Sequence, residues 1–398
     1  MNPTQYVRHG SFGTLLMGCL LAQGCMSPTA LDHAVMAYDQ TTTDILSKQL
    51  LLNIARAHQH QPLHFTGVSN IAATFNFQFN AGATPAMTGE AGGLITPILG
   101  GTVSENPTIS IVPIEGEEFT SRLLAPFQES KLTMLLRQGA DVDTVLRLLV
   151  GEWRTELNGL GKVYNNKPSD TEGYRQFRQV VAHLSSIQDR HALYVEPLWL
   201  ERSWQLSRQS LTPEQLIALQ QNFKVDYNLH TQQLTLSKHV SGHIILTNYD
   251  PQRLSNEERI RLNEEADNSA SNDVMVDVRA GYPGGELPIH GVFRLRSFYN
   301  VLNFIGQDIE AEPEYPVEKH PQTPEIRENP VHTLQVSVTA QQPDNAELSV
   351  AYGDYYYAIQ PETGYQWNRE SFRLLYQIFQ MTVTNLKQEG APGITIAK

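Results

Sequence analysis

The longest regular pattern in the chain is an alternation of apolar and polar residues between Asn70 and Ile111. Every odd position from 71 to 87 is apolar, namely Ile71, Ala73, Phe75, Phe77, Phe79, Ala81, Ala83, Pro85 and Met87. Because successive side chains of a strand point to opposite faces, this alternation predicts a strand far longer than the usual length of about five or six residues. A second arm repeats the period after the glycine-rich stretch 89–93. The sequence therefore predicts a long amphipathic β-hairpin.

The rest of the chain alternates between the helical and the strand period. Helical spacing covers 31–57, much of 114–188 and the segment after Asn368, whereas strand alternation covers 192–206, 223–246, 274–278, 334–338 and 348–357. The final helix has apolar residues on two faces, which indicates that it is buried. We therefore expect an α+β fold with antiparallel sheets flanked by helices, and with the long amphipathic β-hairpin near the N-terminus.

Some helices are predicted from their apolar stripes and others from their first residues. The stripes predict helices over Asp141–Leu157 and Phe293–Ile305. Capping boxes, in which a serine or threonine is followed three residues later by Glu or Gln, predict helix starts at Ser169–Glu172, Thr212–Gln215 and Ser255–Glu258. In each box the two side chains satisfy backbone N–H groups that the first helical turn leaves free.

The N-terminal stretch Ser11–Cys25 is uncharged and mostly apolar, and it follows a short segment that carries Arg8. This layout is typical of a secretory signal, whose apolar core is too short to span a bilayer. The residues Leu21-Ala22-Gln23-Gly24-Cys25 resemble the lipobox of bacterial lipoproteins, and Cys19 also ends a run that fits the pattern. The resemblance implies cleavage before the cysteine and lipidation at Cys25, which we favour over Cys19 because it leaves the longer apolar core.

Lipidation at Cys25 would place the protein in the bacterial outer membrane, held by its lipid and facing the periplasm. In the lipobox family the following residues, Met26 and Ser27 with no aspartate, indicate the outer membrane. The pattern then divides the chain as follows: signal peptide 1–24; tether 25–30; N-terminal helix, hairpin and helical block 31–190; mixed α/β region 191–311; proline-rich linker or extended crossing segment 312–330; C-terminal β-hairpin plus buried helix 331–398.

The net charge and the cysteine content limit the kinds of molecule that the protein can bind. The formal net charge is −13, and loss of Arg8 with the signal makes it −14. Such an acidic balance argues against nucleic acid and against electrostatic binding to anionic lipid, so the lipid anchor itself must hold the protein to the membrane. The chain has only two cysteines, Cys19 and Cys25, and cleavage leaves one. We therefore expect neither an intrachain disulfide nor a thiolate metal site.

Candidate chemistry is sparse. The chain contains no GxSxG, SxxK, HExxH, P-loop or GxGxxG motif. Glu115, Glu117 and Glu118 suit a glycan-cleaving carboxylate pair, but acidic residues in a first helical turn also complement the helix dipole, which we favour. The histidines His58, His60 and His64 could bind a metal ion, but we favour the interpretation that they lie at a solvated helix end. The tyrosines 355–357 with Trp367 suit sugar stacking or a sheet core. We assign no catalytic residue, cofactor or metal.

Glu105–Phe127 and Phe293–Gly306 resemble segments of a family of bacterial envelope lipoproteins to which no activity is assigned. Three hypotheses remain. The first is a non-catalytic scaffold or component of an envelope assembly or export system, with other envelope proteins as partners. The second is an oligomeric outer-membrane pore whose 70–111 hairpin, with Phe75, Phe77 and Phe79 on its apolar face, enters the bilayer as a homo-oligomer. The third is a cell-wall or glycan-acting enzyme.

Overall fold

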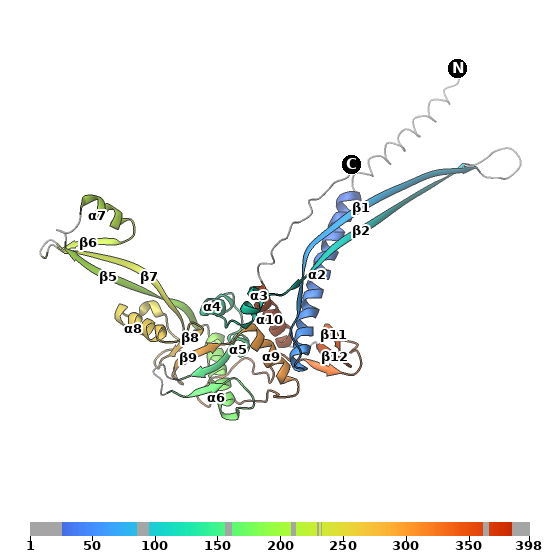
Figure 1. Ribbon diagram of the computed structural model, residues 1–398. Coiled ribbons are helices and arrows are strands. Elements are labelled where there is room, and N and C mark those ends of the chain that lie inside the picture. The colour runs from blue at the N-terminus through green and yellow to red at the C-terminus, as the bar shows by residue number, and fades with distance from the viewer. Residues whose placement is uncertain are drawn as a thin grey trace, which may run out of the picture. The chain divides into compact units, whose positions relative to one another are not determined.

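The computed structural model describes residues 26–85, 95–155, 161–207, 212–228, 231, 233–360 and 366–383 (Figure 1). Nine α-helices and sheets of mixed and antiparallel pairing lie within these residues, which confirms the predicted α+β class. The chain forms two compact units. Of the described residues, those within 26–49 and 64–115 belong to the first, and those within 50–63 and 116–383 belong to the second.

Helix α2 (Met26–His58) opens the described chain and contributes residues to both units. It begins within the predicted tether, five residues before the expected start at residue 31. Pro28 permits this early start because the N–H that proline lacks is not needed in the first turn of a helix. None of the helices within the described residues has the length and apolar composition needed to cross a bilayer.

The first unit contains the antiparallel pair of strands β1 (Phe65–Pro85) and β2 (Ile95–Ile114). Their register runs from Phe65 opposite Ile114 to Pro85 opposite Ile95, with one irregularity between Val68 and Asn70. Next to the base of this pair, the side chain of Gln49 on α2 accepts a hydrogen bond from the backbone N–H of Thr66 (3.2 Å) and donates one to its hydroxyl.

The second unit begins its helical part with α3 (Glu117–Leu124), α4 (Glu129–Arg137), α5 (Val142–Leu149) and α6 (Thr171–Asp189). The helix predicted over Asp141–Leu157 is wrong beyond Leu149. Val150 turns to an extended conformation and the chain continues as strand β3 (Val150–Arg154), which pairs with β4 (Val163–Asn165). The pairing of β3 in the sheet overrides the helical spacing of the apolar residues there.

A seven-stranded sheet forms the centre of the second unit, with the order β4-β3-β9-β8-β7-β5 and β6 paired to β7. Its remaining strands are β5 (Tyr194–Ser207), β6 (Lys224–Asn228), β7 (Gln233–Thr247), β8 (Asp273–Val278) and β9 (Ile289–Leu295). All pairs are antiparallel except β7 with β8, which are parallel, so the sheet is mixed. The helix predicted over Phe293–Ile305 begins only at Phe298, because residues up to Leu295 complete β9.

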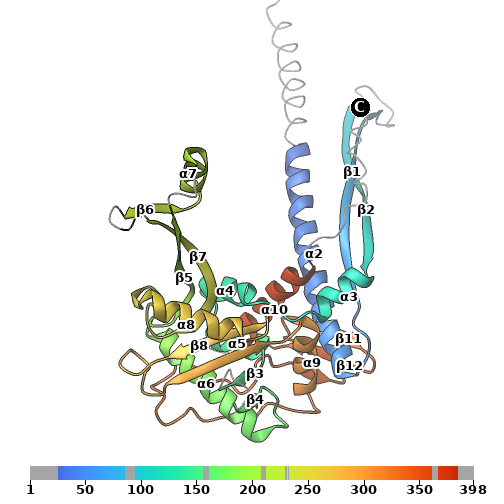
Figure 2. The same ribbon diagram turned by 60° about the vertical axis from the view of Figure 1, so that its left-hand side comes forward.

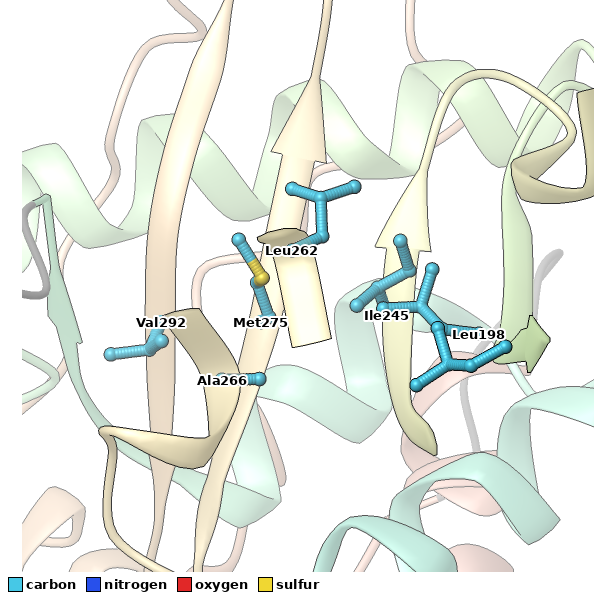
Figure 3. Packing of buried hydrophobic residues seen from close by; sticks show 7 residues of the cluster. Leu198, Ile245, Leu262, Ala266, Met275 and Val292 are labelled. Carbon is cyan, nitrogen blue, oxygen red and sulfur yellow. The ribbon is translucent and has the colours of Figure 1, made fainter. Parts of the chain in front are cut away.

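Helix α8 (Asn256–Asp267), preceded by the 3-10 helix η3 (Pro251–Arg253), covers part of this sheet (Figure 3). Leu262 and Ala266 of α8 pack with Leu198, Ile245, Met275 and Val292 from four strands, and all six are at least 95 % buried. Full burial of a leucine, isoleucine, methionine or valine side chain contributes about 1.5–3 kcal/mol. This cluster holds the base of the long strands β5 and β7.

Strands β5 and β7 pair over their whole length and continue beyond this core as a ribbon (Figures 1 and 2). Strand β6 and helix α7 (Pro213–Gln220) lie at its far end. The predicted capping boxes at Thr212–Gln215 and Ser255–Glu258 are both present, at the starts of α7 and α8. At α6 the capping residue is Asp170, whose carboxylate accepts from Gly173 N, in place of the predicted Ser169.

The last part of the second unit contains α9 (Phe298–Asp308), an extended segment, a three-stranded sheet and α10 (Trp367–Val383). The sheet has the order β10-β12-β11, from β10 (Ser337–Thr339), β11 (Leu348–Tyr352) and β12 (Tyr355–Ile359). The side chain of Asn368, in the first turn of α10, donates to Gln335 O (2.9 Å) and accepts from Gln335 N (2.7 Å).

Candidate functional site

The β1/β2 ribbon carries the residues that the sequence singles out as a membrane hairpin. In the backbone register Phe75 is opposite Glu105, Phe77 is opposite Val103 and Phe79 is opposite Gly101. The structure describes the backbone at these positions, whereas their side chains fall outside the described part. Cys25, Cys19 and the predicted signal 1–24 lie outside the described residues altogether. Lipidation at Cys25 and insertion of the three phenylalanines therefore stay predictions.

The glutamates weighed as a catalytic pair lie at the junction of β2 and α3. Glu117 and Glu118 occupy the first turn of α3 and are exposed. Glu118 pairs with Arg122, one turn later on the same helix. Acidic side chains at this end of a helix and an i,i+4 ion pair both stabilise the helix modestly. The observed contacts of Glu118 are typical of an acidic residue in the first turn of a surface helix.

The histidines weighed as metal ligands have other surroundings. His58 Nδ1 lies 2.9 Å from the hydroxyl of Tyr357, and its Nε2 lies 3.4 Å from the carboxylate of Glu310. The two rings meet edge to face, with centroids 5.7 Å apart. Both nitrogens of His58 thus face protein groups. His60 follows the end of α2 in a left-handed conformation (φ 54°), and His64 belongs to the first unit.

The aromatic residues near the C-terminus contribute mainly to packing. Tyr355 is 49 % exposed, Tyr356 is intermediate and Tyr357 is fully buried, so burial increases along strand β12. Trp367 is buried, and its indole N–H donates to the backbone oxygens of His332 and Thr333. Tyr355 is therefore exposed to contact with another molecule, Tyr356 is partly buried, and Tyr357 and Trp367 are part of the core.

The sequence reasoning missed a buried ionic network around Glu314, which lies in the second unit. Glu314 Oε1 accepts hydrogen bonds from the hydroxyls of Tyr174 (2.6 Å) and Thr333 (3.0 Å). The same oxygen lies 3.3 Å from Arg147 Nη2 and 3.7 Å from Arg178 Nη1. Both guanidinium groups are at least 98 % buried. Arg147 on α5 and Arg178 on α6 lie among the inward-facing apolar residues of their helices. A charged residue on the apolar face of a predicted helix is the feature of the sequence that indicates a buried ion pair.

Backbone oxygens complete the network. Arg147 donates to the carbonyls of Pro330 (3.1 Å) and Val331 (2.7 Å), and Arg178 donates to that of Pro330 (3.1 Å). Residues 312–330 contain neither helix nor strand. They cross the second unit as an extended chain whose two ends are held by Glu314 and by these carbonyls. The two arginines therefore provide hydrogen bonds to backbone carbonyls that a helix or a sheet would otherwise satisfy.

Ionisation in the network follows from these contacts. Burial raises the pKa of Glu314, but the charges of Arg147 and Arg178 and the bond from Tyr174 outweigh burial and lower it below its ordinary value. Burial and the charge of Glu314 raise the pKa of Tyr174. The network therefore holds a carboxylate against two guanidinium groups, and Tyr174 stays a neutral donor.

Asp308, Glu314 and His332 bring one ligand-type atom each within 4.8 Å of one another. Their atoms are used within the protein. Asp308 accepts from the backbone N–H of Glu314 (2.6 Å), and its carboxylate lies 2.9 Å from His332 Nδ1. With two arginines beside Glu314, this group fits an ion-pair network better than a cation site, because the positive charges oppose a metal ion.

Comparison with known proteins gives no relative for this chain: no family model matches it, and neither a curated protein nor a solved structure is significantly similar.

Proposed function

We propose that this chain is a non-catalytic lipoprotein of the bacterial outer membrane, which acts as a scaffold or as a component of an envelope assembly or export system. In this proposal the lipid at Cys25 holds the chain to the membrane, facing the periplasm. The β1/β2 ribbon then contacts other chains, which are further copies of this protein or other envelope proteins.

The observation that carries the proposal is the β1/β2 ribbon, because strands of 21 and 20 residues pair only with each other among the described strands. An isolated two-stranded hairpin is marginal in water, and stability usually requires a third strand or a covering surface. A long unpaired strand edge also offers N–H and C=O groups to another strand. A ribbon of this length therefore calls for a partner along its edge or its face.

Site-specific photo-crosslinking tests this. A photoreactive residue at position 74, within β1, is expected to give adducts with a second chain in intact envelopes. A matched residue at position 341, in an exposed loop of the second unit, is expected to give none. Absence of adducts from position 74 and from its neighbours on both faces of the ribbon would contradict the proposal.

A second candidate function is an oligomeric outer-membrane pore, which the register favours. The register pairs odd positions of β1 with odd positions of β2, so the apolar series 71–85 lies opposite Ile109, Val103, Leu99 and Ile95. Directly opposite residues share a face of an antiparallel pair. The two amphipathic patterns therefore coincide, which gives the amphipathic hairpin one apolar and one polar face.

Length and charge also fit a bilayer. Strands of 20 residues extend roughly 65 Å, and a tilt of about 45° leaves roughly 45 Å across the membrane, compared with about 40–45 Å for a bilayer with its headgroups. The chain has neither Lys nor Arg between Arg56 and Arg122. Glu105 opposite Phe75 is the one charge paired with the apolar series of β1. Because one hairpin leaves two open edges, a pore requires several copies in a ring.

Single cysteines at positions 75, 77 and 79 and at positions 76, 78 and 80, with the anchor at Cys25 preserved, test the pore. The pore predicts that a lipid-phase reagent labels the first series and a water-soluble reagent labels the second. Equal labelling of both series by the water-soluble reagent would exclude insertion and leave the scaffold role standing.

A further inference from the structure

A cavity of about 350 Å³ in the second unit lies between α9 and the β3/β4 edge of the seven-stranded sheet. Five carboxamide side chains share its lining, and they are Asn165, Asn166, Asn300, Asn303 and Gln307. Three of them stand on α9 at spacings of three and four residues, which places them on one face of the helix. Carboxamides on one helix face give the cavity both hydrogen-bond donors and acceptors.

Arg296, which follows β9 directly, also lines this cavity and is 92 % buried. Its Nε and Nη2 donate to Val150 O, and Nη2 also donates to Asn166 O (3.4 Å). The guanidinium carbon lies 4.4 Å from the ring centroid of Phe304. Within the described residues no carboxylate pairs with it, and no partner is present for its Nη1. Burial lowers the pKa of Arg296 to about 10, although the charge of Glu314 partly offsets this effect. A buried charge without a counter-charge is costly, and an anionic ligand would remove that cost.

The other charges of the cavity cancel. Lys167 Nζ lies 3.1 Å from Glu312 Oε1, so this pair adds no net charge to the lining. Asn166 donates from Nδ2 to the carbonyls of Arg147 and Val150, while its own Oδ1 is buried without a hydrogen-bond partner in the described structure. Glu312 Oε2 is likewise buried without a hydrogen-bond partner in the described structure. The lining therefore combines an arginine that no carboxylate of the described chain pairs with directly and polar oxygens that could accept hydrogen bonds from a ligand.

We propose that this cavity binds a small acidic sugar, with the carboxylate beside Arg296 and the hydroxyls beside the carboxamides of α9. Because Nε and Nη2 of Arg296 already donate to backbone oxygens, Nη1 is the group that would donate to the carboxylate, and the charges of the two groups are complementary. A hydroxyl both donates and accepts, as a carboxamide does, so five carboxamides suit a polyhydroxylated molecule better than an apolar one. The volume is near the lower end of about 300–1,000 Å³ for ligand sites, which suits one or two sugar rings. This site is independent of the β1/β2 ribbon.

Isothermal titration of the purified full chain with D-glucuronate tests the proposal. For a ligand of this size we expect one site with a Kd on the order of 1 mM or tighter. D-glucose, which lacks the carboxylate, is expected to bind at least tenfold more weakly. N-acetylglycine, a carboxylate without the sugar hydroxyls, is expected to bind more weakly as well. Equal binding of N-acetylglycine would overturn the sugar assignment in favour of a peptide-like carboxylate, and equal binding of glucose would overturn the role of Arg296.

Substitutions test whether glucuronate binds in this cavity. Asn303→Asp adds a carboxylate to the cavity wall at a partly buried position with little change of shape, so we expect at least a tenfold loss of glucuronate affinity. Asn345→Asp makes the same charge change in an exposed loop and is expected to bind as the parent does. Arg296→Met is expected to abolish binding, and Asn303→Asp keeps the test valid if that variant does not fold. Unchanged affinity in Asn303→Asp, or no binding of glucuronate to the parent chain, would overturn the proposal.

Discussion

The β1/β2 ribbon and the β5/β7 ribbon are both long antiparallel strand pairs, but they differ in how their edges are protected from water and from other strands. β5 and β7 start from the central sheet, carry β6 as a further strand and include the charged residues Glu201, Arg202 and Lys238. β1 and β2 are longer, pair only with each other among the described strands and contain neither Lys nor Arg. Charges and added strands protect the edges of a ribbon in water. The β5/β7 ribbon has this protection, and β1/β2 lacks it.

The aromatic residues of the β5/β7 ribbon point to the same conclusion. Trp199 and Trp204 are about half exposed, and Trp204 meets Phe223 edge to face at 5.5 Å. Lys238 Nζ lies 5.7 Å from the centroid of Phe223. The far end of the ribbon is thus covered by its own α7–β6 connection and by a cation. The phenylalanines of β1 have no such basic residue within their ribbon sequence.

The largest expected effect concerns the buried core of the second unit, away from both ribbons. Glu314→Gln removes the carboxylate closest to both Arg147 and Arg178 and leaves Asp143, 3.9 Å from Arg147 Nε, as a more distant counter-charge, so we expect a loss of about 3–5 kcal/mol in the free energy of unfolding. Urea denaturation measures this loss. Glu325→Gln, which removes an exposed carboxylate from the same extended segment, is the control and is expected to change stability by less than about 0.5 kcal/mol. Equal stability of the two variants would show that the network is dispensable.

The next effect tests the two ribbons directly. If β1 enters the bilayer, Phe77→Lys places a charge near the midplane and costs about 2–4 kcal/mol. That cost lowers the equilibrium for the assembled form by about 30- to 700-fold, which native electrophoresis of membrane extracts detects. Ser203→Lys makes the same addition at an exposed position of β5 and is expected to leave assembly unchanged. Equal effects of the two substitutions would remove the distinction between the ribbons.

A smaller effect is expected at the far end of the β5/β7 ribbon. Trp204→Ala removes the edge-to-face pair with Phe223, which is worth about 0.5–1.5 kcal/mol beyond the buried area. We expect faster amide hydrogen exchange in β6 and unchanged exchange in β8, which lies in the core. Trp199→Ala, at an exposed position on the same strand, is the comparison. Equal exchange rates of β6 in both variants would contradict a role for the aromatic pair.

The smallest effect depends on pH. His243 on β7 lies 3.1 Å from Glu129 and 2.9 Å from Asp267. Burial lowers the pKa of His243, but the hydrogen bonds to these carboxylates outweigh burial and raise it above the ordinary value. A raised pKa means that the protonated form stabilises the fold. This contribution is fully present below a pH of about 6.5 and is lost as the pH rises through the folded-state pKa.

Urea denaturation between pH 5 and 9 measures this contribution as the difference between the parent and His243→Gln. We expect the variant to be less stable at low pH and to approach the parent at high pH. His239→Gln, at an exposed position of the same strand, is the control for the effect of replacing a histidine by glutamine on β7. A parallel offset for His243→Gln across the whole range would exclude its ion pairs as the cause.

Local signals in the sequence predicted local structure well. The capping boxes before α7 and α8 require only residues three apart, and both are present in the structure. The α+β class follows from the alternation of helical and strand periods. Strand β9 was missed because its apolar residues continue into α9, and only pairing with β3 and β8 decides where the strand ends. Tertiary pairing of this kind leaves no signal within a short window of sequence.

The residues of the candidate sites depend on contacts between distant parts of the chain. Glu314 meets Arg147 at a separation of 167 residues, and Asn165 shares a cavity with Gln307. An arginine among apolar residues of α5 predicts that a partner exists, without identifying it. The predicted hairpin is the opposite case, since its two arms are close in sequence and their periods indicate which residues share a face.

The mass of the native assembly tests the central claim most directly. Thr74 and Asn106 are backbone partners, so deletion of residues 75–105 and closure with Asn-Gly keeps the base of the β1/β2 ribbon paired. If the ribbon joins other chains, the full lipoprotein, extracted in mild detergent, has the mass of a multi-chain assembly in light scattering, and the deletion variant has the mass of one chain with unchanged unfolding of the second unit. Equal masses for the two proteins would contradict the claim that β1 and β2 join this chain to others.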